Sequence, residues 1–379
     1  MERIAFRAMG CQMLAVVDSA GPAVRAILAE VPGWFATWEQ CLSRFRPDSE
    51  LSRINHRARS GWITVSPTLW AALETALEAA RASDGLVTPT VLAALERAGY
   101  DWDFAVLDRE PEPRRGSAAR GGRSDTLQPS ADGATLSSDA LNGTATSVRP
   151  PARARSVRRR RGSERATWCH GVDNSVPARR SADTVRDWRA IRLDPGRRRI
   201  ALPAGAGLDL GGSAKGWAAD RAARKLAAYG PALVDAGGDI AVTGPRADGS
   251  PWPVGVADPL HPGAELDLLL LSAGGVATSG RDLRRWHHGG VEQHHLIDPR
   301  TGQPATTDLL AATIVGPDVQ EAEMAAKVVM LLGRDGGLHW LAARPQLAGL
   351  LVTAAGRVIR TATLAPYRWR EPANAGVLP

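Results

Sequence analysis

An arginine-rich segment at residues 109–187 most constrains how this chain can fold. It is rich in Arg, Ser, Ala, Gly and Pro, contains the block Arg158–Arg161 and has few large apolar side chains. Such a composition cannot bury enough apolar surface to offset the entropy lost on ordering. We therefore expect a disordered insertion that divides one folded domain into residues 1–108 and 188–370, followed by a short tail at 371–379.

The same segment accounts for the basic character of the chain. Residues 111–187 hold 15 arginines and 8 acidic residues, a net charge of +7, which equals the net charge of all 379 residues. The rest of the chain is therefore electrically balanced, and a high pI does not by itself indicate a nucleic-acid surface. Trp168 is the one aromatic residue in the segment, so we expect no specific nucleic-acid recognition and keep non-specific binding through the arginines as the weakest alternative.

The cysteines and the apolar runs bear on the compartment. Cys11, Cys41 and Cys169 are odd in number and widely scattered, which favours a reducing compartment over a disulfide framework. No run approaches the roughly 18 apolar residues that cross a bilayer. The first residues show no basic region followed by an apolar one. We expect a cytoplasmic protein, or one at the cytoplasmic face of a membrane, with no transmembrane segment.

The order of elements predicts the fold class. Residues 3–17 are typical of a strand pair, and helical periodicity predicts helices over Pro22–Phe45, Ser66–Ser83 and Val319–Gly333. Beyond residue 188, strands follow one another more often than they alternate with helices. This order favours an α+β fold with mixed, largely antiparallel sheets flanked by helices.

The stretch Gly207–Asp220 is the chemically strongest part of the chain. It reads as a strand end, a glycine turn and a helix start, an arrangement that can hold phosphate on free backbone N–H groups. It matches neither the Walker nor the dinucleotide glycine pattern, so a helix packed on a sheet with Lys215 in solvent is the alternative. Of 47 basic residues only Lys215, Lys225 and Lys327 are lysines, which draws attention to each of them.

A series of motifs adds to this stretch. They are, in chain order, MGC (Met9–Cys11), SRFRPDSELSRIN (Ser43–Asn55), DGLVTPTV (Asp84–Val91), LDLGGSAKGWAAD (Leu208–Asp220), LVDAGGDI (Leu233–Ile240), ATSGRD (Ala277–Asp282), HHLIDPRTGQPA (His294–Ala305) and AEMAAK (Ala322–Lys327). Together they resemble the FAD:protein FMN transferase family, the ApbE-type flavin transferases. The resemblance covers nearly all of the chain outside the insertion and rests on the joint order of motifs that are each weak alone.

The resemblance implies a reaction and its participants. Such enzymes cut FAD at its diphosphate, pass FMN to a Thr or Ser hydroxyl of an acceptor protein and release AMP, with magnesium as cofactor. The resemblance implies contacts with FAD at Met9, Phe45, Leu86, Val87, Thr88, Asp209, Lys215 and Ile297. An FAD-binding protein without transfer, or an FAD pyrophosphatase without a protein acceptor, is the alternative function.

His295 and Asp298 are the candidate catalytic residues. Attack on a diphosphate needs its oxygen charge neutralised and a base near the attacking hydroxyl. We expect His295 to be that base, with Asp298 as its orienter or as an alternative base. The competing interpretation is a core histidine on a strand. Spacing does not favour zinc at His287, His288, His294 and His295, and Asp239 either caps a turn or, by the resemblance, lines the site.

The metal position departs from the family. The resemblance places the backbone carbonyl of Gly212 toward magnesium, and it aligns Glu323 and Lys327 with positions where members commonly have Asp and Thr ligands. Residues four apart share a helix face, so one interpretation is a surface ion pair worth a few tenths of a kcal/mol. The other is that the ammonium of Lys327 replaces part of the charge of the metal.

Overall fold

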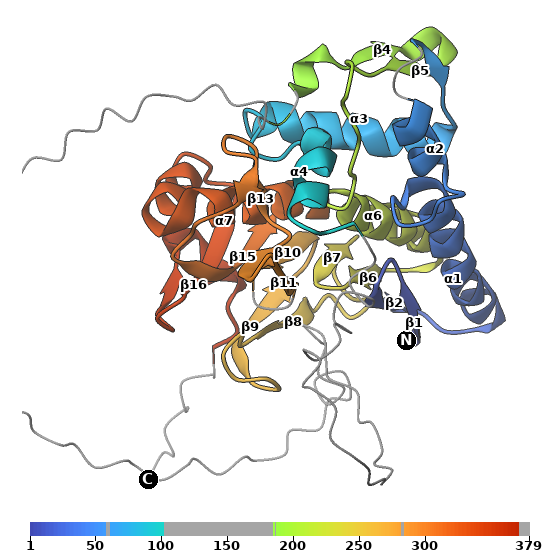
Figure 1. Cartoon of the computed structure of the whole chain (residues 1–379). Coiled ribbons are helices and arrows are strands. Elements are labelled where there is room, and N and C mark those ends of the chain that lie inside the picture. Colours follow the sequence, from blue (N-terminus) through green and yellow to red (C-terminus); the bar gives the residue numbers. More distant parts are fainter. Residues whose placement is uncertain (58–60, 102–184, 186, 282–283, 371–379) are drawn as a thin grey trace, which may run out of the picture.

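A computed structural model describes residues 1–57, 61–101, 185, 187–281 and 284–370 (Figure 1). Almost all of the predicted insertion lies outside the described residues, as does the predicted tail, so the expectation of disorder there stays a prediction. No helix in the described ranges is long and apolar enough to cross a membrane.

An antiparallel sheet of eight strands organises the described part of the chain. Every neighbouring pair in it is antiparallel, and the α+β fold expected from the sequence is confirmed. In spatial order the strands are β1 (Glu2–Ala8), β2 (Cys11–Val17), β6 (Ala232–Ala236), β7 (Asp239–Val242), β10 (Gly274–Gly280), β15 (Leu309–Gly316), β16 (Ala348–Thr353) and β17 (Val358–Arg360).

Helices cover one face of this sheet. Helix α6 (Ala214–Leu226) packs on β6 and β7, and α7 (Val319–Ala342) packs on β10 and β15. Helix α1 (Pro22–Leu42) packs on β1 and ends before Phe45, because Ser43 adopts extended backbone. Helix α7 continues past the predicted end at Gly333, where φ is 72° and the helix is kinked. The other helices are α2 (Glu50–Arg57), α3 (Pro67–Ala82) and α4 (Leu92–Arg97).

A hairpin covers the opposite face. Strands β8 (Trp252–Ala257) and β9 (Glu265–Leu271) pair with each other, and their apolar residues pack against the sheet. Successive strand residues point to opposite faces: Leu233 packs with the hairpin, whereas Val234 packs with the helices. Strand β6, inside the sheet, is therefore buried on both sides, and its sequence ALVDA contains no exposed position.

Short strands and 3-10 turns complete the fold. The small strands are β3 (Ile63–Thr64), β4 (Arg192–Asp194), β5 (Arg199–Ala201), β11 (Arg285–His288), β12 (Val291–His294), β13 (Ile297–Asp298) and β14 (Gln303–Pro304). The 3-10 turns are η1 (Pro89–Val91), η2 (Trp188–Ala190), η3 (Pro195–Arg197), η4 (Ala227–Tyr229) and η5 (Ala362–Tyr367). Ser49 caps the start of α2, because its side-chain oxygen accepts the N–H of Ser52 at 2.9 Å.

Candidate functional site

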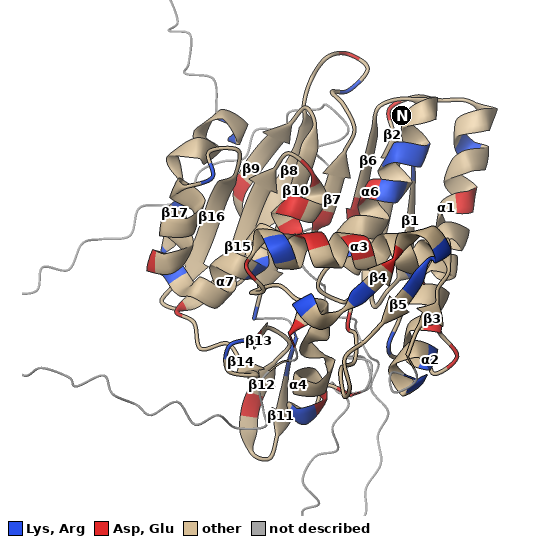
Figure 2. Ribbon diagram, turned by 90° about the horizontal axis from the view of Figure 1, so that it is seen from above, with Lys and Arg blue, Asp and Glu red and all other residues tan. Residues whose placement is uncertain are grey.

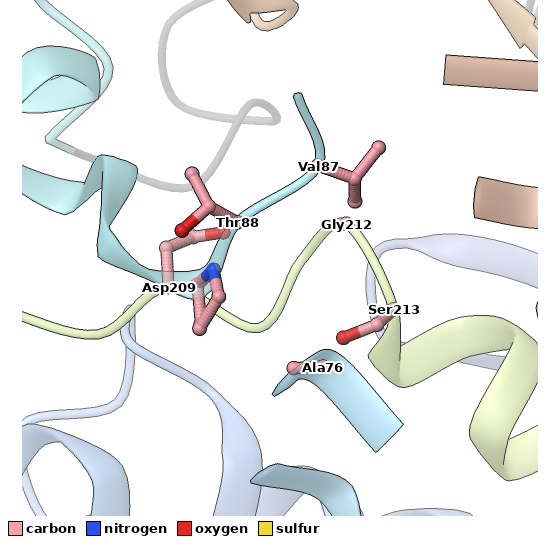
Figure 3. Close-up of a pocket in the computed structure, with 7 residues that line it drawn as sticks. Ala76, Val87, Thr88, Asp209, Gly212 and Ser213 are labelled. Atoms are coloured by element: carbon pink, nitrogen blue, oxygen red, sulfur yellow. The ribbon is translucent and has the colours of Figure 1, made fainter. Parts of the chain in front are cut away.

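A small pocket opens between the loop that leads into η1 and the turn that leads into α6 (Figure 3). The N–H of Asp209 donates to the carbonyl of Pro89 at 2.8 Å, which holds the two segments together. The lining residues are Ala76, Val87, Thr88, Pro89, Asp209, Gly212 and Ser213. Four of the residues predicted from the sequence, namely Val87, Thr88, Asp209 and Gly212, are thus brought to one place from segments more than a hundred residues apart.

The carboxylate of Asp209 is buried and already paired. Arg44 Nε lies 2.6 Å from Asp209 Oδ2, and the N–H of Gly211 donates to Oδ1 at 2.9 Å. This arrangement fixes the glycine turn before α6, because the carboxylate binds the backbone two residues on. A direct contact of Asp209 with FAD stays a prediction.

An aromatic cluster surrounds Arg44. Its guanidinium lies 4.1 Å from the centroid of the Phe45 ring and 4.7 Å from that of Tyr100, within the range of cation–π attraction. Tyr100 stacks on Trp286 with centroids 4.9 Å apart, and Ile297 packs in the same cluster. Phe45 and Ile297, both predicted to contact FAD, therefore lie together beside a rigid cation.

The loop after α3 is fixed by its own polar groups and by α7. The Thr88 and Thr90 hydroxyls lie 2.9 Å apart, and Thr88 caps η1. Val87, with Leu86 at its edge, packs in an apolar cluster with residues of α7. The pocket wall is consequently held on the helix that carries Glu323 and Lys327.

Buried charges gather where α6 and α7 face each other. Lys215 forms an ion pair with Asp239, whose side chain is 2% exposed. On α7, Lys327 Nζ lies 3.0 Å from Glu323 Oε1, with side chains 15% and 2% exposed. We use the name charge cluster for Lys215, Asp235, Asp239, Arg284, Glu323 and Lys327. The interpretation of Glu323 and Lys327 as a surface pair is wrong, as is that of Lys215 in solvent, because both pairs are buried between helices and sheet.

Burial and mutual electrostatic interactions shift pKa values within the charge cluster. Burial acts to lower the pKa of Lys215, but the Asp239 and Glu323 carboxylates outweigh it and raise the pKa above its ordinary value. Burial raises the pKa of Asp235 to about 7. It also raises the pKa of Glu323, against the opposing effect of Lys327. Lys215 is thus held charged, whereas Asp235 and Glu323 are biased toward protonation.

His295 is half-buried beside the same cations. Burial, followed by the charges of Arg284 and Lys327, lowers its pKa well below the ordinary value. Its Nδ1 has no hydrogen-bond partner among the described residues. A neutral imidazole with a free nitrogen is the form that accepts a proton. The catalytic role of His295 stays a prediction that this setting favours.

Asp298 is bound by Arg300 in the described part of the chain. Its carboxylate accepts from Arg300 Nε at 2.9 Å and Nη2 at 2.7 Å, and from the Arg300 N–H at 2.9 Å. Because a carboxylate readily binds the backbone two residues on, the turn that starts at Asp298 captures it. In this geometry Asp298 is paired with Arg300, and its role as an orienter of His295 or as an alternative base stays a prediction.

The turn between β1 and β2 lies near these groups through Arg284. Arg284 Nη2 donates to Cys11 Sγ at 3.1 Å. Met9 adopts a positive φ of 49°, and its N–H donates to Glu39 Oε2 at 2.9 Å. The predicted contact of Met9 with FAD stays a prediction, and the structure places its turn next to a buried cation.

The residues at the predicted metal position do not fit a divalent cation. Glu323 Oε1 is taken by Lys327, and Oε2 accepts the N–H of Gly216 at 3.1 Å. Lys327, the third residue at the predicted metal position, carries an ammonium, which has no lone pair to donate to a metal ion. Within the described residues, no group of three or more His, Cys, Asp or Glu side chains is arranged to hold a metal ion. The described residues include His287, His288, His294 and His295, the four histidines considered for zinc in the sequence.

Sequence reasoning missed Arg44 and Arg284. Arg44 meets Asp209 across 165 positions, and nothing local marks that pairing. Arginine is so frequent in this chain that no single one stands out. Asp239, by contrast, directly follows Gly237 and Gly238, and that glycine turn is a local signal that marks it in the sequence.

Comparisons with known proteins agree with this geometry. The chain is 29% identical over 347 residues to the FAD:protein FMN transferase of Treponema pallidum, covering 88% of this chain and 79% of that protein. It is similar in fold to the ApbE protein of Thermotoga maritima (TM-score 0.71, 23% identity, 97% and 99% of the two chains) and to the flavin transferase ApbE of Vibrio cholerae (TM-score 0.64, 19% identity, 97% and 99%). The model of the ApbE family matches residues 9–142 and 161–351, and the chain therefore belongs to the ApbE family.

Proposed function

We infer that this protein is an FAD:protein FMN transferase, which moves FMN from FAD to a Thr or Ser hydroxyl of an acceptor protein and releases AMP. The single observation that carries the inference is His295, whose Nδ1 is buried without a hydrogen-bond partner among the described residues, beside Arg284 and Lys327 of the charge cluster. The name of the Treponema relative supports the same reaction. The acceptor and the cytoplasmic location expected from the sequence belong to this proposal.

The chemistry uses these groups in a defined way. The acceptor hydroxyl oxygen attacks the phosphorus of the FMN half, and the bond from that phosphorus to the bridging oxygen breaks. The bridging oxygen leaves with AMP, and the hydroxyl proton passes to His295. The buried cations Lys215, Lys327 and Arg284 stabilise the negative charge on the phosphoryl oxygens. Magnesium, which the resemblance implies, has no fitting donor set at Gly212, Glu323 and Lys327, and we assign it no step.

Binding residues follow from the pocket. We propose that the diphosphate lies against the turn at Gly212, with Asp209, Leu86, Val87 and Thr88 lining the approach. The rings of FAD lie against Phe45, Ile297 and Met9. Arg44, fixed between Phe45 and Tyr100, positions Asp209 in this scheme.

The test is incubation with FAD, magnesium and an acceptor protein that carries a flavinylation site. We expect covalent, acid-stable flavin fluorescence on the acceptor and one AMP released for each flavin attached. The variant His295→Gln should still bind FAD but transfer at least about 100-fold more slowly, the order of a lost general base. Bound FAD without AMP release in the wild-type protein would overturn the proposal.

The alternative activities give different products in the same assay. Free FMN together with AMP indicates an FAD pyrophosphatase, and bound FAD alone indicates a passive binder. In the view of Figure 2, acidic and basic residues are interspersed along the described ribbon. Non-specific nucleic-acid binding through the arginines of residues 109–187, which lie outside the described residues, stays the weakest alternative.

A further inference from the structure

Two of the three lysines in the chain lie in the charge cluster. Arginine serves almost every other basic position, and Lys215 and Lys327 differ from it in presenting a compact point charge with three N–H donors. Both lysine side chains are largely buried, each 15% exposed. Burying an ammonium is costly unless a partner compensates its charge. Asp239 and Glu323 provide that compensation for Lys215 and Lys327, which indicates that both lysines have a specific role.

Lys327 reaches the pocket wall. A Cβ placed on Gly212 would lie 3.5 Å from Lys327 Cε, which puts the lysine stem in contact distance of a turn that lines the pocket. Val87, another lining residue, packs on α7 on the same side. The ammonium is thus held next to the place where the diphosphate is proposed to bind.

Glu323 holds this ammonium without using all of its donors. The two carboxylate oxygens of Glu323 have different donors: Oε1 accepts from Lys327, and Oε2 accepts the N–H of Gly216. The Glu323 backbone oxygen lies 3.5 Å from Lys327 Nζ. An ammonium has three donors, so within the described part of the chain at least one N–H of Lys327 stays available for an anionic oxygen.

The charges of the cluster do not cancel. Lys215, Lys327 and Arg284 are positive, whereas Asp239 and Glu323 supply two negative charges. Asp235 adds a third only above about pH 7, because burial raises its pKa to about 7. Below that pH one positive charge is unmatched, and a protonated Glu323 would add to it. An anion compensates this excess, whereas a divalent cation would increase it.

We propose that the ammonium of Lys327 takes the place of a divalent cation at this site, so that the diphosphate of FAD binds to the protein without an added metal ion. The proposal deepens the proposed function and rests on it. Its ligand class is a dinucleotide diphosphate. Lys327 acts as a binding residue and Glu323 as the residue that positions it.

The test measures FAD affinity by fluorescence anisotropy in EDTA and, in parallel, in excess magnesium chloride. We expect the wild-type dissociation constants to agree within about threefold. Lys327→Met should weaken binding in EDTA at least tenfold, an effect of about 1.4 kcal/mol. Lys225→Met, which removes the remaining lysine, outside the cluster, should bind as the wild type does.

The outcomes separate this proposal from the function. Wild-type binding that appears only with magnesium overturns the metal-free site and leaves the transferase standing. A lack of FAD binding in both buffers overturns the transferase and this proposal together. If Lys327→Met does not fold by circular dichroism, Glu323→Gln replaces it: retained binding in EDTA supports the ammonium as the anion ligand, and magnesium-dependent binding refutes it.

Discussion

Two ion pairs with the same sequence spacing have different surroundings. Asp220 and Arg224 on α6 and Glu323 and Lys327 on α7 are both acid–base pairs four residues apart. In the first pair Arg224 is 70% exposed and Asp220 15% exposed, whereas in the second Lys327 is 15% exposed and Glu323 2% exposed. The i, i+4 rule predicts both contacts equally well. Only the packing of the two helices decides which pair is a solvated one and which is an element of the site.

The difference has an energetic meaning. Exposed pairs contribute about 0.3–0.5 kcal/mol, because water screens them and two long side chains lose freedom. Removing one partner of a buried pair costs about 3–5 kcal/mol, because the other charge is left uncompensated. A buried pair therefore contributes little net stability, yet losing one of its two partners strongly destabilises the fold.

The largest expected effect comes from breaking the buried pair. Lys327→Met should lower the free energy of unfolding by about 3 kcal/mol, measured by urea denaturation. The double variant Glu323→Gln/Lys327→Met should recover at least half of that loss, since no buried charge remains unpaired. A double-mutant cycle with no coupling beyond about 0.5 kcal/mol would place the buried pair in the same class as the exposed one.

A second effect concerns the space that the buried pair needs. A Cβ on Gly216 would lie 2.5 Å from Glu323 Oε2, so Gly216→Ala must displace the carboxylate. We expect a loss of about 1–3 kcal/mol, against the usual gain from replacing a helical glycine. Gly33 in α1 is exposed with nothing within 4 Å of the added atom, and Gly33→Ala should instead stabilise the protein by about 0.5–1 kcal/mol. Equal signs for the two variants in thermal melts would contradict this account.

A third effect is a pH dependence confined to the buried region. In the folded protein the pKa of Asp235 is raised from 3.8 to about 7, so the folded state binds this proton more tightly than the unfolded chain does. The associated stability is present below about pH 4 and is lost as the pH rises through 7.

Asp235→Asn removes this titration. Its stability relative to the wild type should rise between pH 4.5 and pH 7.5 in urea unfolding experiments. The amide keeps an oxygen that can accept the N–H of Gly238, which lies 2.7 Å from Oδ1 in the wild type. A constant gap between the two proteins across this range would show that Asp235 does not carry the effect.

The smallest effect belongs to the exposed pair. Arg224→Met should change the free energy of unfolding by less than about 0.5 kcal/mol, and the change should shrink further in 0.5 M salt. FAD binding should stay at the wild-type value. A loss comparable to that of Lys327→Met would remove the distinction on which the comparison rests.

Local patterns predicted the elements, and several motif residues do meet. Periodicity placed α3 and the β1–β2 pair, and glycine turns marked the segment before α6. Val87, Thr88, Asp209 and Gly212 gather at one pocket as the resemblance implied. The scarcity of lysine in the sequence draws attention to Lys215 and Lys327, and both belong to the charge cluster.

The remainder depends on contacts that no local pattern encodes. The pairing of Arg44 with Asp209 is set by how α1 and its following turn dock on the loop before α6. Asp298 binds Arg300 because the backbone N–H and the guanidinium of that residue lie close enough to donate to its carboxylate. The burial of Lys327 follows from the close approach of α6 and α7 at Gly216. The i, i+4 spacing of an ion pair does not predict such tertiary packing.

The pairing of β2 with β6 has a consequence for synthesis of the chain. Met13 pairs with Ala236, so β2 leaves the ribosome more than two hundred residues before its neighbour. At 5–20 residues per second, the delay is on the order of 10 s. Through this interval the β2 edge of the β1–β2 hairpin stays unpaired, and its apolar face stays unburied. We expect chaperones to hold the nascent N-terminal part until the second half of the sheet arrives.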